Sequence, residues 1–163
     1  MINHPANEKY ALFLQAVYTT TDAAQVQEVL DQTLNNLYRI HHQELLPALL
    51  DKLPSSLSLQ LRAIFTSPNL KPANLDTLKT VCEELQQSLH QCPLLSLTLA
   101  FNPSFHLAEK LGQLIKQEFG INVILELNVD PSIIAGSVIT FKGKYLDNSL
   151  HNKIKQYLQS EKL

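Results

Sequence analysis

Apolar residues recur every three or four positions through the first ninety residues, which is the spacing of one face of a helix. This spacing predicts five helices, at Glu8–Tyr18, Asp22–Ile40, Gln43–Leu53, Ser56–Phe65 and Asn74–Leu89. Thr21 or Asp22 can cap the second helix, Asn74 can cap the fifth, and Pro54 ends the third. Because each apolar stripe needs a neighbour to cover it, the pattern predicts a small antiparallel helical bundle.

The pattern changes at Pro93, after which Leu95, Leu97 and Leu99 alternate with smaller or polar residues, as in a strand. A helix follows, with Ser104 as its cap and Gly120 as the residue after its end. Its expected apolar face comprises Phe105, Ala108, Leu111, Leu114, Ile115 and Phe119. We therefore expect an α+β protein with a helical bundle at 1–91 and a small α/β domain at 92–163.

Residues 123–158 show the densest series of turn and strand signals. A strand at 123–129 leads into a turn at Asp130-Pro131-Ser132, because proline fixes φ and offers no N–H. Ala135-Gly136 allows a bend, and Lys142-Gly143 can close a hairpin. Asp147, Asn148 or Ser149 can cap a final helix. The apolar face of that helix would comprise Leu150, Ile154, Tyr157 and Leu158.

This order of elements resembles the C-terminal signature of the delta subunit of F-type ATP synthases, the family that includes the mitochondrial oligomycin-sensitivity-conferring protein. The residues that carry the resemblance in structural roles are Asp130, Pro131, Ala135, Gly136, Gly143, Asp147 and Ser149. The family usually has Gly-Gly where this chain has Ala135-Gly136. Tyr10-Ala11-Leu12-Phe13 is also similar to the start of the family's first helix, without two intervening residues.

The resemblance implies a non-catalytic stator subunit without a cofactor, which ties the catalytic head to the peripheral stalk at the cytoplasmic face of the cell membrane. In the family, the bundle binds the N-terminal helices of the α subunits and the second domain binds the C-terminal end of the b subunit. Candidate contacts for the α subunits are Tyr10, Phe13 and Val17. Candidate contacts for the b subunit are Leu150, Lys153, Ile154 and Tyr157. For most of these residues, a place in the core is the simpler interpretation.

Composition narrows the range of functions. The chain has 163 residues, is 45% hydrophobic and 17% charged, and carries a formal net charge of −2. This balance favours a globular protein and gives no reason to expect nucleic-acid binding. No apolar run reaches the roughly 18 residues of a membrane span, so we expect membrane association only through a partner. Cys82 and Cys92 can form a disulfide, but reduced thiols in a cytosolic protein are favoured.

Few residues suggest chemistry of their own. His41-His42 lacks a partner at the spacing of a helical zinc pair, and adjacent Glu83-Glu84 would point about 100° apart on a helix. Lys142, Lys144, Lys153 and Lys155 form a loose basic cluster that is either a solvated face or a contact for an acidic partner segment. Two alternatives stay open: a delta-like adaptor outside an ATP synthase, and, with less support, a small α/β enzyme.

Overall fold

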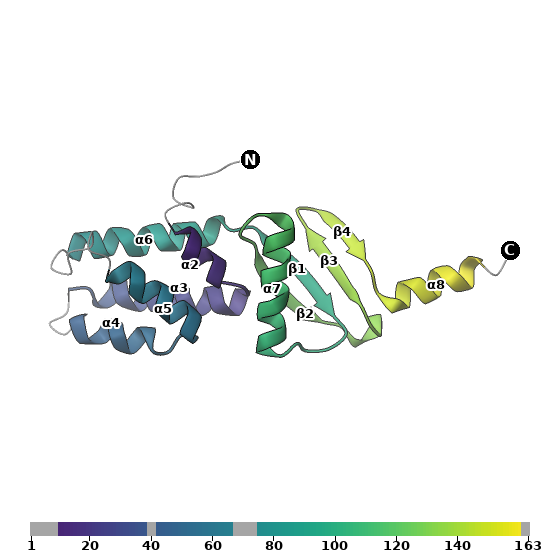
Figure 1. Ribbon diagram of the computed structural model, residues 1–163, viewed down its shortest axis with the longest axis horizontal. Coiled ribbons are helices and arrows are strands. Elements are labelled where there is room, and N and C mark those ends of the chain that lie inside the picture. The colour runs from purple at the N-terminus through teal and green to yellow at the C-terminus, as the bar shows by residue number, and fades with distance from the viewer. Residues whose placement is uncertain (1–9, 39–41, 67–74, 161–163) are drawn as a thin grey trace. The chain divides into compact units, whose positions relative to one another are not determined.

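The computed structural model describes residues 10–38, 42–66 and 75–160 of the chain. It is an α+β protein whose N-terminal part is helical and whose C-terminal part holds a four-stranded sheet (Figure 1). The chain divides into two compact units: residues 1–17 with 21–92, and residues 18–20 with 93–163.

The first unit contains the helices α2 (Ala11–Ala16), α3 (Thr20–Asn36, apart from its first residue), α4 (His42–Leu50), α5 (Ser55–Phe65) and α6 (Leu75–Gln91). Their buried side chains follow the predicted stripes, for example Val26 and Leu30 in α3, and Leu57 and Leu61 in α5. Tyr10 fixes the start of α2 to α6, because its hydroxyl donates a 2.5 Å hydrogen bond to Glu84.

Several of the predicted helix boundaries are wrong; α3, for example, ends at Asn36 and α6 at Gln91. α2 ends at Ala16 because Val17 has extended backbone angles, φ −86° and ψ 105°. α3 begins at Thr20, so Thr21 and Asp22 lie in its first turn and neither is its cap. α4 ends at Leu50, and Pro54 is the residue before α5. The predicted cap Asn74 lies outside the described residues.

The second unit is built on a mixed sheet in the order β2-β1-β3-β4. Its elements are β1 (Leu94–Leu99), α7 (Phe105–Phe119), β2 (Ile124–Val129), the 3-10 turn η1 (Pro131–Ile133), β3 (Ser137–Phe141), β4 (Lys144–Asp147) and α8 (Leu150–Ser160). β1 and β2 are parallel, as the crossover through α7 requires, whereas β3 and β4 are antiparallel to their neighbours.

One face of this sheet forms the core of the second unit beneath α7 (Figure 1). The register places Leu97 between Leu127 on β2 and Ile139 on β3. Leu111 and Ile115 of α7 pack on this face. Phe105, Leu114 and Phe119 were predicted to share the packed face of α7, but they are 63%, 56% and 46% exposed. Leu114 lies away from the stripe of Ala108, Leu111 and Ile115, whose spacing follows one side of the helix. Phe119 continues that stripe four positions after Ile115, and its half-exposed ring packs edge-on against Phe141 of β3, with 5.1 Å between the ring centroids.

A short segment between α2 and α3 also belongs to this second unit. Thr19 forms a parallel bridge with Leu125, and the Leu125 N–H donates to the Tyr18 carbonyl at 2.8 Å. The Tyr18 ring lies against Gly112 and under the Lys116 ammonium, 4.9 Å from the ring centroid. The second unit therefore includes a short segment that lies more than seventy positions before Pro93, where the rest of the unit begins.

Candidate functional site

The segment that carries the resemblance folds into a series of interlocked turns. The Asp130 carboxylate accepts a 2.9 Å hydrogen bond from the Ser132 N–H, and η1 follows directly. Hydrogen bonds from Ser132 hold the pKa of Asp130 below its ordinary value of 3.8. An Asp-Pro-Ser sequence favours this turn. The proline fixes its own φ, and the aspartate side chain accepts a hydrogen bond from the backbone N–H of the serine that follows.

Ile134, the next residue, has a strained backbone. Its φ is 66° and its ψ is −55°, and the Ala135 N–H donates to the Ile133 carbonyl at 2.7 Å. These features define a γ-turn of the positive-φ type, which is rare. A β-branched residue in such a conformation costs about 1–3 kcal/mol. The sequence does not predict this strain; it predicts only a bend at Ala135-Gly136, one position later.

Gly136 allows the chain to pass close to the start of the last helix. Its φ is 85°, and a Cβ atom placed there would overlap the Asn148 carbonyl oxygen and lie 3.2 Å from the Ser149 Cα. Only glycine avoids both the torsional and the steric cost. The close approach lets the Leu150 N–H reach the Ala135 carbonyl at 2.8 Å.

The hairpin and the cap of α8 complete the segment. Lys142 and Gly143 have φ values of 48° and 76°, the positive pair that a tight hairpin requires. Ser149 caps α8, because its hydroxyl accepts from the Asn152 N–H at 3.1 Å. Asp147 supports the cap by accepting from the Ser149 N–H at 2.9 Å, and hydrogen bonds from Ser149 lower the pKa of its carboxyl.

α8 presents an apolar face that is largely exposed. Leu150, Ile154, Tyr157 and Leu158 are 40%, 43%, 61% and 55% exposed. η1 packs beside α8. Exposed apolar side chains gathered on one helix are typical of a surface that binds another protein.

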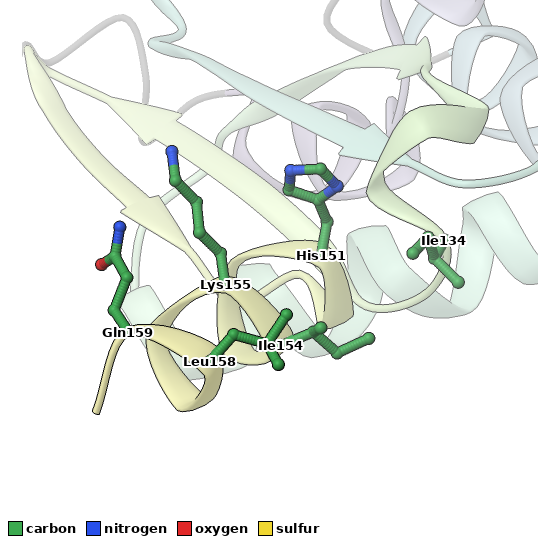
Figure 2. A pocket seen from close by; sticks show the side chains of 6 residues that line it. All are labelled: Ile134, His151, Ile154, Lys155, Leu158 and Gln159. Carbon is green, nitrogen blue, oxygen red and sulfur yellow. The ribbon is translucent and has the colours of Figure 1, made fainter. Parts of the chain in front are cut away.

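An open groove of about 300 Å³ lies between α8 and the γ-turn, lined by Ile134, His151, Ile154, Lys155, Leu158 and Gln159. Figure 2 shows Ile154 and Leu158 along one side of α8, and His151, Lys155 and Gln159 along the next. Ile134 reaches the groove from the γ-turn. We call these six residues the α8 groove.

The candidate residues of the first unit have a different environment. Tyr10, Phe13 and Val17 are 3%, 1% and 1% exposed, so they belong to the core of the bundle and form no exposed stripe. Burial of the apolar face of α2 against its neighbours is the physical reason, because a stripe alone does not distinguish core from partner. On α2 the exposed large apolar residue is Leu12, at 71%.

The remaining candidates for chemistry have structural surroundings. Glu84 binds Tyr10, whereas Glu83 forms an ion pair with Lys79 at 3.8 Å, so the two carboxylates have separate partners. Cys82 and Cys92 form no disulfide, and burial raises the pKa of Cys82 to about 12. Within residues 10–38, 42–66 and 75–160, no group of three or more His, Cys, Asp or Glu side chains could hold a metal ion. His41 lies outside those ranges.

Across the same parts of the chain, no helix has the length and apolar character needed to cross a membrane. The sequence model of a family described as "ATP synthase delta (OSCP) subunit" matches residues 74–160, which is more than half of the chain. That range includes α6 and the whole contiguous part of the second unit up to the end of α8. No curated protein matches the chain significantly.

Proposed function

Because this chain belongs to the ATP synthase delta (OSCP) subunit family, we propose that it is the stator subunit that joins the catalytic head of an F-type ATP synthase to its peripheral stalk. The family is one of structural, non-catalytic subunits of the peripheral stalk. In this role the protein resists the torque that the rotor exerts on the head, so that ion movement stays coupled to ATP synthesis.

The observation that carries the assignment of a binding face is the exposed apolar side of α8. Apolar side chains that face water raise the free energy of the protein. A partner that covers them removes this cost. We propose that the C-terminal end of the b subunit binds here, with Leu150, Ile154 and Tyr157 as apolar contacts and Lys153 on the flank.

For the head, we propose that the N-terminal helices of the α subunits bind the outer surface of the bundle. Since Tyr10, Phe13 and Val17 are buried, exposed leucines are better candidates, namely Leu12 on α2 and Leu59 on α5, at 71% and 67% exposure. These two helices pack against each other, so their surfaces are neighbours. The complex would hold the protein at the cytoplasmic face of the cell membrane.

Affinity purification from detergent-solubilised membranes tests the assignment. The tagged full chain should retain α, β and b subunits in fixed proportion. Recovery of other proteins without synthase subunits would favour the alternative of a delta-like adaptor. Replacing Leu12 and Leu59 with serine should weaken retention of the α subunit, whereas Ile154→Ser with Tyr157→Ser should weaken retention of b.

A further inference from the structure

Ile134 combines a strained backbone with an exposed side chain. It is the central residue of the γ-turn, with φ 66°, yet its side chain is 57% exposed. Packing that leaves more than half of the residue in water is weak compensation for an unfavourable torsion. A glycine would make the same turn without strain, and the loop already has a glycine at 136, where the backbone demands one. The backbone conformation alone therefore does not explain an isoleucine at this position.

The neighbouring hydrogen bonds fix Ile134 beside α8. Its N–H donates to the Pro131 carbonyl at 3.1 Å, and the next residue accepts from the Leu150 N–H at 2.8 Å. The γ-turn is thus tied on one side to η1 and on the other to the start of the helix. This places an apolar side chain at one wall of the α8 groove, opposite Ile154 and Leu158 (Figure 2).

The charges around the α8 groove indicate the kind of segment that fits. α8 has no Asp or Glu in its sequence, and it carries Lys153, Lys155 and His151, of which the last two line the groove. The nearby carboxylates, Asp130 and Asp147, accept hydrogen bonds from backbone N–H groups of their own turns, which favours their ionised form, and both interact electrostatically with His151. Glu161 and Lys162, which follow in the sequence, carry opposite charges. The α8 side of the groove therefore carries the lysines and no carboxylate of its own, which opposes docking of a second, equally basic α8 and favours an acidic segment against this helix.

We propose that Ile134 is a specificity-determining anchor of the α8 groove, held in a strained γ-turn to fill an apolar position on an amphipathic partner helix whose flanks are acidic. The inference rests on the proposed function, since it takes the partner to be the peripheral-stalk helix. The free protein carries the strain, and the compensating apolar contacts of the Ile134 side chain form only in the complex. A few well-placed side chains usually carry most of the binding energy of an interface, and a side chain that is already held in its bound position costs less to order on binding.

Ile134→Gly separates the two roles of the residue. The variant should melt at the same temperature as the unsubstituted protein or higher, because it loses strain. Its affinity for the purified soluble domain of the co-purifying b subunit should fall by about tenfold or more, as expected for removal of a binding anchor. Leu114→Ala is the matched control, since Leu114 is 56% exposed on α7 and lies outside the groove. It should change affinity less than about twofold, as expected of residues outside an interface.

A charge-reversal variant and cross-linking test the partner. Lys155→Glu should weaken binding more at low salt than at high salt, and cross-links from the groove should reach a helix with acidic residues beside its apolar stripe. Four results would each overturn the inference. Ile134→Gly could leave the affinity unchanged, or could lower stability and affinity in parallel. The cross-linked segment could be neutral or basic, or the protein could self-associate through α8. If the unsubstituted chain retains no stalk subunit, the proposed function itself fails; if it binds normally and Ile134→Gly does too, only the anchor is wrong.

Discussion

A methyl group added at Gly136 should destabilise the second unit, for two separable reasons. The φ of 85° places an L residue in the left-handed region, which costs about 1–2 kcal/mol. The new Cβ would also overlap the backbone oxygen of Asn148, and overpacking of this kind costs about 1–3 kcal/mol. Because the obstructing atoms are backbone at the cap of α8, they cannot rotate away. Gly136→Ala should therefore lower the free energy of unfolding of this unit by about 2–5 kcal/mol.

Gly143→Ala is the matched control for the torsional part of this cost. Its φ is 76°, but a Cβ there would have no atom within 4 Å. It should cost only about 1–2 kcal/mol. Native-state hydrogen exchange of peptides covering β3 and β4 reports the second unit, and peptides from α6 serve as the internal reference that should not change. Equal costs for the two variants would refute the close approach between Gly136 and Asn148, and with it the account of how α8 is anchored.

Three further results are expected. In the full chain the Leu125 N–H donates to the Tyr18 carbonyl, which a fragment of residues 94–163 lacks. Hydrogen exchange of this N–H should therefore be faster in the fragment. Equal protection would show that the segment 18–20 does not belong to the second unit. The lowered pKa of Asp147 means that its contribution to stability is present above its ordinary value of 3.8 and lost as the pH falls through the lower folded-state pKa. Urea titrations between pH 2 and 6 should therefore be less pH-dependent for Asp147→Asn. Cys82, fully buried and with a pKa raised to about 12, should resist alkylation at pH 8 until the protein unfolds, which mass spectrometry of the native and urea-treated protein checks.

Local sequence signals predicted the second unit well where the interaction is itself local. Ser104 caps α7 by accepting from the Leu107 N–H, and Gly120 ends that helix with φ 63°, both as expected. The hairpin at Lys142-Gly143 also forms at the predicted position. In each case the residue that makes the cap or turn lies within four positions of its hydrogen-bond partner, so a short stretch of sequence contains the whole interaction.

The sequence could not decide between alternatives where the outcome depends on residues distant in the sequence. The apolar side of α2 looks the same whether it meets the bundle or a partner, and only the fold shows that Tyr10 and Phe13 are buried. The extended segment at Tyr18-Thr19 interrupts a helical pattern because β2, more than a hundred positions later, offers it a free edge. Its run of β-branched and aromatic residues was the available signal. The strain at Ile134 had no comparable signal, because isoleucine rarely adopts positive φ.

Deletion of α8 tests most directly the claim that this protein anchors the stalk through its second unit. Membranes would be prepared from cells whose chain ends after Ser149, and ATP hydrolysis and ATP-driven ion pumping would be measured in the same vesicles. The account predicts that hydrolysis by the head persists while pumping is lost, because the stalk has no attachment. Full pumping with the truncated chain as the sole copy, at normal abundance, would contradict it.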